Sequence, residues 1–337
     1  MNIHRLLFSR SNGRKPKPKT KMTKINREDI HIISRHSNLS ETSINNILKE
    51  QIYSDKEAWN KFLRLFFISL GVSFTTAGII FFFAYNWADL HKFIKIGLIE
   101  SLIVAIVSVV LFTKIRLDIK NILLTGASIL VGVLFAVFGQ VYQTGANAYD
   151  FFLGWTMFIT LWVAISNFAP LWLLFIILVN TTLVLYSQQV AHDWSNIFVC
   201  TLLFIINVLF LISSIFGKKV IKGIKTPNWF SNLLALGCVS ISSIGISIGI
   251  FDIKETAFFV LVVITSILYT FGIKYGLKVK SGFYLSIIPF GIIIIISAFL
   301  IKLSNEAEMF LFISLFVITS VTLVIKNLID LQKIWTK

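Results

Sequence analysis

Long apolar runs without charged side chains constrain this chain more than any other feature of its sequence. Five of these runs contain no charge at all: residues 65–85, 122–141, 197–216, 230–251 and 283–301. A helix that crosses the hydrocarbon core of a bilayer needs about 20 such residues, with about 17 to 25 tolerated. Each run therefore predicts a transmembrane helix.

Five further runs approach the same length. Residues 93–112 qualify although they contain two charged side chains, and shorter runs occur at residues 151–166, 170–186, 257–273 and 309–325. Together the runs predict an all-α polytopic transmembrane helix bundle of about ten spans. The fourth and fifth spans are separated only by residues 167–169, so a re-entrant hairpin or two half-helices is an alternative there. That alternative removes two spans and leaves both termini on the same side.

The distribution of lysine and arginine predicts the orientation of the spans. The chain has 31 Lys and Arg against 16 Asp and Glu, a net charge of +15. Basic residues are enriched in short cytoplasmic loops. They gather in alternate loops, at residues 114–120, 218–225 and 274–280, whereas the intervening loops contain only Lys92, Lys254 and Lys302. Both termini are therefore predicted to lie in the cytoplasm, and the spans in the plasma membrane.

The residues before the first span form two predicted segments. Residues 1–24 are a basic disordered tail, residues 25–62 are a cytoplasmic helical segment, and residues 63–337 are the transmembrane domain. The tail has the charge to touch anionic lipid or nucleic acid, but a solvated tail without a specific nucleic-acid partner is favoured, and Met22 is an alternative start. Residues 25–62 offer a surface for a protein partner, although helices that pack on each other and on the membrane face are the simpler interpretation.

Polar and charged residues near the predicted outer face define a candidate site. Glu100 lies about 10 Å below the outer edge of its span, and Lys95 lies closer to that edge. Intramembrane charges suggest function, so Glu100 is a candidate proton or cation site, with a structural acceptor or a protonated carboxyl as alternatives. The predicted outer polar pocket comprises Asn86, Trp87, Lys95, Glu100, Gln140, Tyr142, Gln143, Asn147 and Asp150.

Other residue patterns are typical of helix packing rather than chemistry. Stripes of small residues at residues 128–139 and 238–249 let helices approach closely. Asn180 and Asn207 are expected to hydrogen-bond between helices, and Cys200 and Cys238 to pack as small hydrophobes. Paired carboxylates, histidine clusters and a nucleophile with a base are not recognisable, so we predict no enzyme activity, no metal site and no cofactor.

Three sequence motifs resemble a known family. They are residues 82–87, Lys95 together with Glu100, and residues 138–146. The chain resembles the family of domain of unknown function 2157 over about residues 25–190. The resemblance implies a bacterial multi-pass membrane protein with a short cytoplasmic helical segment before its first span. It implies no activity, because that family has no assigned chemistry.

Two classes of function follow from these predictions. Ten spans, Glu100 and the outer polar residues favour a small-solute or proton/cation-coupled transporter. The alternative is a membrane scaffold, assembly factor or sensor, which would use residues 25–62 inside and residues 143–150 outside. The lipid bilayer is the one partner that the sequence requires, and no oligomeric state is predicted.

Overall fold

A computed structural model describes residues 40, 42–44, 56–85, 90–143, 145–220, 226–252, 255–303 and 307–335. The chain divides into two compact units, residues 1–63 and 64–337. The predicted basic tail and most of the predicted helical segment at residues 25–62 lie outside the described residues. Within that segment, residues 42–44 are helical and a long helix begins at Lys56.

Ten long helices carry the fold in the described part of the chain. They are α3 (Lys56–Tyr85), α4 (Lys92–Phe112), α5 (Leu117–Tyr142), α6 (Ala148–Ser166), α7 (Ala169–Gln189), α8 (Asn196–Val220), α9 (Asn228–Phe251), α10 (Thr256–Val279), α11 (Gly282–Leu303) and α12 (Ala307–Trp335). All ten contain a stretch long and apolar enough to cross a membrane. The all-α class and the ten predicted spans are confirmed.

Several helices are longer than the apolar run that predicted them. The first begins at Lys56 instead of residue 65, and the last continues to Trp335 instead of ending at residue 325. Polar and charged residues such as Lys326 and Asp330 extend α12 because they are compatible with helix and need only leave the hydrocarbon region. Hydropathy thus located each span but not the ends of its helix.

The tight connection after the fourth span is a turn between two complete helices. Asn167 takes a left-handed conformation (φ +46°) that ends α6, and Pro170 lies in the first turn of α7. Asparagine tolerates that conformation, and proline suits a helix start because its missing N–H is not needed there. With 19 and 21 residues, both helices are uninterrupted, so the alternative of half-helices does not describe this region.

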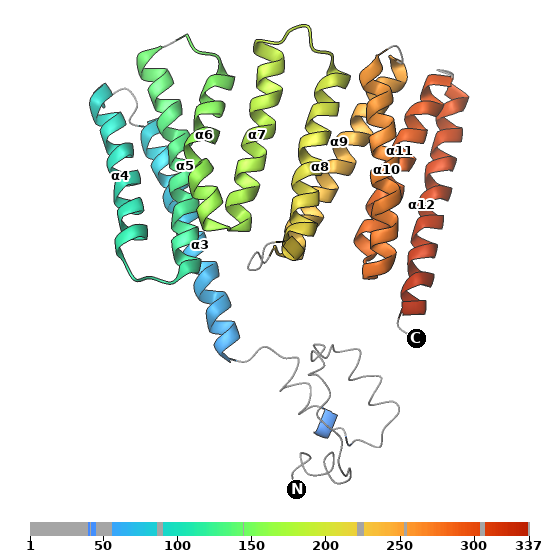
Figure 1. The fold of residues 1–337 in the computed structure, drawn as a ribbon, viewed down its shortest axis with the longest axis horizontal. Helices are drawn as coiled ribbons and strands as arrows, with labels where there is room; N and C mark the ends of the chain where they lie inside the picture. The colour runs from blue at the N-terminus through green and yellow to red at the C-terminus, as the bar shows by residue number, and fades with distance from the viewer. Residues whose placement is uncertain are drawn as a thin grey trace. The chain divides into compact units, whose positions relative to one another are not determined.

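Two hydrophobic cores organise residues 64–337. One is built from α3 to α7 around Ile99, Leu130 and Ile159, and the other from α7 to α11 around Phe204 and Leu261. We call residues 64–189 the amino-terminal bundle and residues 196–335 the carboxyl-terminal bundle. Helix α7 contributes to both cores and packs against α8, so the bundles meet at this pair of helices (Figure 1).

The outer faces of the helices present large apolar side chains. Phe74 and Phe81 on α3, and Leu311 and Ile318 on α12, are each at least 65% exposed. Soluble proteins do not expose apolar surface on this scale, whereas lipid covers it without cost. The helices therefore have surfaces suited to contact with a bilayer.

An amide pair joins α7 to α8. The Asn207 side-chain amide donates to the Asn180 carbonyl oxygen at 2.7 Å, and the Asn180 amide donates back to Asn207 at 3.2 Å. Each amide also donates to a backbone carbonyl of its own helix. The predicted interhelical bond is confirmed, and it connects the two bundles.

Candidate functional site

The predicted outer pocket is described only in part. Asn86 and Trp87 lie outside the described residues. Lys95 is buried on the face of α4 that also buries Ile99 and Ile103. Glu100 is exposed, because successive residues of a helix turn by about 100° and only its neighbour Ile99 faces the core.

Glu100 also lies away from the groove between α3 and α4. That groove has a volume of about 640 Å³, and α4 contributes Leu98, Ser101, Leu102 and Ala105 to it. Glu100 is about 160° around the helix from Leu98. Its carboxyl therefore points from an apolar helix surface rather than into this groove.

The end of α5 carries three more of the predicted residues. Gln140, Tyr142 and Gln143 are exposed, and the Tyr142 ring lies 4.6 Å from that of Phe138. Gln143 has a left-handed backbone (φ 44°), and its N–H donates to the carbonyl of Gly139, which ends the helix. An aromatic side chain of this kind suits a membrane interface.

Asn147 and Asp150 begin α6. The Asp150 carboxylate accepts the Asn147 backbone N–H at 3.0 Å, which satisfies a donor that the helix start would otherwise leave unpaired. Next to them, the Tyr149 N–H donates to the Gln189 side chain at the end of α7. Asp150 thus has a structural role that its spacing from Asn147 could have indicated. Whether the outer residues form one pocket stays a prediction.

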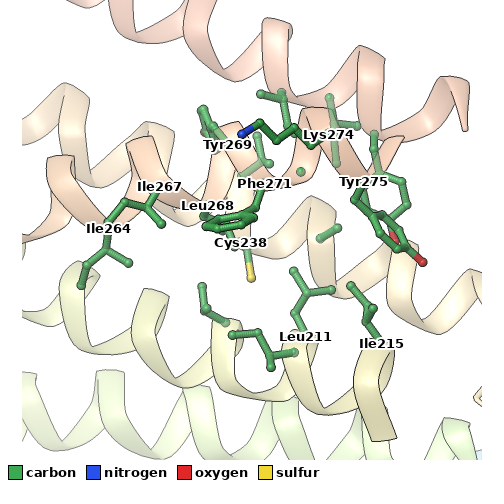
Figure 2. Close-up of a pocket in the computed structure, with 18 of the residues that line it drawn as sticks. Leu211, Ile215, Cys238, Ile264, Ile267, Leu268, Tyr269, Phe271, Lys274 and Tyr275 are labelled. Carbon is green, nitrogen blue, oxygen red and sulfur yellow. The ribbon is translucent and has the colours of Figure 1, made fainter. Parts of the chain in front are cut away.

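A second region, in the carboxyl-terminal bundle, contains a cavity of about 610 Å³. Residues from four helices line it: Val208, Leu211, Ile212, Ile215 and Phe216 of α8; Ala235, Cys238 and Val239 of α9; Ile264, Ile267, Leu268, Tyr269, Phe271, Gly272, Lys274, Tyr275 and Lys278 of α10; and Tyr284, Ile287 and Ile288 of α11. Figure 2 shows Leu211 and Ile215 of α8 facing the labelled residues of α10.

The walls of this cavity differ in exposure. Residues from α9 and α11, such as Cys238 and Ile288, are buried and form its floor. Residues from α8 and α10, such as Phe216 and Phe271, are exposed at its edges. The cavity therefore opens sideways between α8 and α10, onto the apolar surface of the bundle.

Lysine and tyrosine residues lie at one end of the cavity. Lys274 and Lys278 line it near the end of α10, together with Tyr275 and Tyr284, whose rings are 5.3 Å apart and perpendicular. These residues belong to the side that the charge distribution predicts to be cytoplasmic. Apart from them and Tyr269, the lining is almost wholly apolar.

A group of hydroxyls lies beside the cavity floor. The Tyr269 hydroxyl is 3.0 Å from that of Ser242 and 3.3 Å from that of Ser243, and all three residues are buried. Gly291 of α11 approaches the same group so closely that a Cβ there would be 2.8 Å from the Tyr269 oxygen and from the Ser243 oxygen. This contact of α9, α10 and α11 fixes Tyr269 at the cavity wall.

The cavity was not predicted from the sequence. Lys274 and Lys278 had indicated topology only, although two lysines one turn apart beside Tyr275 are a recognisable pattern at a membrane interface. Within the described residues, no group of three His, Cys, Asp or Glu side chains is arranged to hold a metal ion. The cavity has apolar walls and a small number of polar residues, a combination that is usual in small-molecule sites.

A comparison with models of protein families gives a match to part of the chain. Residues 38–172 match the family model described as "Predicted membrane protein (DUF2157)". The match includes α3 to α6 and the first residues of α7, and it confirms the predicted resemblance over that part of the chain. No curated protein and no solved structure matches. The cavity lies beyond the matched residues.

Proposed function

We propose that this protein is a small-solute transporter of the bacterial plasma membrane, with both termini in the cytoplasm, and that its solute is an amphiphile. The cavity of about 610 Å³ between α8, α9, α10 and α11 carries the proposal. Its volume falls in the range of roughly 300–1,000 Å³ that is usual for small-molecule sites.

The chemistry of the walls favours an amphiphile over an ion or a sugar. A strongly hydrated solute would lose its water in this cavity and gain few hydrogen bonds, since the lining side chains are mostly aliphatic and aromatic. A solute with an apolar body fits these walls, and its polar end would lie at Lys274 and Lys278. The sideways opening provides access from the lipid.

The arrangement of the helices supports movement of such a solute. Each bundle has five helices, so in the proposed topology the two bundles enter the membrane from opposite sides. Many transporters are built from two oppositely oriented halves that rock against each other. Here α7 and α8, with the Asn180–Asn207 pair, provide the contact about which the halves would move.

Transport can be tested with the full chain in sealed vesicles. NBD-labelled phosphatidylglycerol and NBD-labelled phosphatidylcholine are placed in both leaflets, and dithionite bleaches the outer label. We expect wild-type vesicles to bleach beyond the outer half for at least one probe. Bleaching that stops at half for both, as in empty vesicles, contradicts the proposal.

A matched pair of variants assigns transport to the cavity. Ala235→Phe places a ring inside the cavity, because Ala235 is buried and lines it. Leu236→Phe adds a ring on the next residue of α9, which is exposed. We expect Ala235→Phe to lower the bleaching rate at least tenfold and Leu236→Phe to leave it near the wild-type value.

Coupling to protons or cations is a separate part of the proposal. Glu100 is the acidic residue within α4, and its neutralisation by Glu100→Gln keeps the shape of the side chain. If Glu100 couples transport, a pH-sensitive dye inside the vesicles will report proton movement in wild type and none in the variant. Equal proton movement in both removes Glu100 from the pathway.

A scaffold, assembly factor or sensor is the second candidate function. The exposed position of Glu100 on an apolar helix favours it, because a carboxyl facing lipid gains from a partner helix that supplies a donor. Chemical crosslinking in native membranes tests this function. A crosslinked partner that is present with wild type and lost with Glu100→Gln supports the scaffold, and an unchanged pattern contradicts a partner at Glu100.

A further inference from the structure

We infer that the cavity binds an anionic phospholipid, with one acyl chain between α8 and α10 and the phosphate at Lys274 and Lys278. The inference rests on the proposed function for its choice of site, but it concerns binding alone. It names the chemical class of the amphiphile, which the apolar walls by themselves leave open.

Lys274 and Lys278 place two positive charges at the cavity. They are four residues apart on α10, so their side chains lie one turn apart on the same side of the helix, and both line the cavity. Like charges at this spacing repel each other. Neither lysine forms an ion pair with a carboxylate in the part of the chain that the structure describes. A phosphate between them would replace this repulsion by two attractions.

Lys274 and Lys278 lie near the end of α10 that is predicted to be cytoplasmic. They belong to the last two turns of this helix. In membrane proteins, basic pockets between helices on the cytoplasmic side bind anionic headgroups. Tyr275 and Tyr284 lie at the same end, and such rings have an apolar body and a polar tip suited to the headgroup region. Figure 2 shows Lys274 and Tyr275 beside the cavity.

The cavity opens sideways between α8 and α10. Its edges include Ile212 and Phe216 of α8 and Ile267 and Phe271 of α10, with exposed fractions of 43, 52, 53 and 66%. An acyl chain can pass between these apolar residues without leaving an apolar environment. The buried residues of α9 and α11 behind them offer contacts along the chain, whereas a free inorganic anion would use the lysines only.

Native mass spectrometry of the purified full chain tests the inference. The protein is delipidated, given equal amounts of phosphatidylglycerol and phosphatidylcholine, and the retained lipid is counted. A basic residue near an anionic surface contributes about fivefold, so the pair predicts a preference for phosphatidylglycerol of roughly 25-fold. Equal retention of the two lipids overturns the inference.

Variants locate the bound lipid. Lys274→Gln with Lys278→Gln should abolish the preference, and Lys274→Arg with Lys278→Arg should keep it. Lys114→Gln with Lys326→Gln removes the same charge from residues that do not line the cavity, and it should leave the preference unchanged. If both glutamine pairs lower retention equally, the preference reflects net charge, and the inference fails.

The acyl chain is tested separately from the charge. Ala235→Phe should lower the retention of phosphatidylglycerol while Leu236→Phe does not, with circular dichroism confirming that both variants keep their helix content. Retention that survives Ala235→Phe places the lipid elsewhere and overturns the inference. If the protein retains phosphatidylglycerol selectively but bleaching by dithionite stops at the outer half of the label, the lipid-binding inference is supported and the transporter proposal is contradicted. Failure of the inference can therefore be distinguished from failure of the proposed function.

Discussion

The two bundles differ in what lies beside their stripes of small residues. In the amino-terminal bundle, aromatic rings of α6 lie against glycines of α5: a Cβ on Gly132 would be 2.5 Å from the Trp155 ring, and one on Gly139 would be 2.6 Å from the Phe151 ring. In the carboxyl-terminal bundle, α9 lies at the centre with buried Cys238, Ser242, Gly245 and Gly249. Neighbouring helices approach this stripe closely, and the cavity lies beside it.

In the amino-terminal bundle, a hydrogen bond fixes one of these rings. The indole N–H of Trp155 donates to the Ser128 carbonyl at 2.7 Å, so the ring that fills the notch at Gly132 is held in place. On α9, Leu261 and the Phe258 ring fill the space at Gly245 and Gly249, whereas the cavity lies at Cys238, near the other end of the stripe. Two stripes of small residues can thus differ in that one is covered along its glycines and the other also borders a cavity.

The largest expected effect comes from filling the notch at Gly132. Gly132→Leu displaces the Trp155 ring and breaks its hydrogen bond, so we expect the free energy of unfolding to fall by about 3 kcal/mol, the sum of overpacking and a lost bond. Thermal unfolding in detergent measures this. Gly97→Leu, at a glycine of α4 with open space around it, is the control. Equal stability of both variants would show that the ring is not held.

A smaller loss is expected at the contact between α9, α10 and α11. Gly291→Ala places a methyl group 2.8 Å from Val239, Ser243 and Tyr269, and we expect a loss of about 2 kcal/mol because the methyl group is confined by two other helices. Gly237→Ala, where no atom lies within 4 Å, is the control and should be neutral or stabilising. A neutral Gly291→Ala would mean that this contact is as adaptable as the cavity beside it.

Removing the amide pair tests the connection between the bundles. Asn207→Leu should cost about 0.6 to 1.7 kcal/mol, the range for interhelical hydrogen bonds in membranes, since Asn180 keeps its bond to the carbonyl of Ile176. Calorimetry should show the unfolding transition broadening as the bundles become less coupled. The double variant with Asn180→Leu should cost less than the sum of the two single changes, and simple additivity would show that the pair does not connect them.

The smallest effect is expected from one hydroxyl at the cavity wall. Tyr269→Phe removes the contacts to Ser242 and Ser243, and we expect it to cost about 0.6 kcal/mol. Tyr275→Phe is the control, because Tyr275 lines the same cavity but is not the tyrosine that contacts Ser242 and Ser243. Urea or thermal unfolding of the two variants under one condition separates them. A larger loss with Tyr275→Phe would reverse their assigned roles.

The outer polar residues show where prediction from single residues was incomplete. Glu100 and Lys95 were identified because charges are costly inside a membrane, but the sequence did not reveal that Lys95 is buried and Glu100 exposed. Asp150 was assigned to a pocket, and the structure shows that it also caps α6. The predictions of an interhelical amide pair and of a packed small-residue stripe on α9 are confirmed. Polar and small residues within a span have few stable positions other than a helix interface.

The sequence by itself determined the all-α class, the ten spans and the distribution of positive charge between the loops. These follow from local requirements, since a crossing needs about 20 apolar residues whatever the rest of the chain does. Only the tertiary structure decided which helix faces are buried, which helices meet at α9, and that Lys274 and Lys278 lie at an apolar cavity. Lipid and protein interior are both apolar, so hydrophobicity does not distinguish the inward face of a span from its outward face.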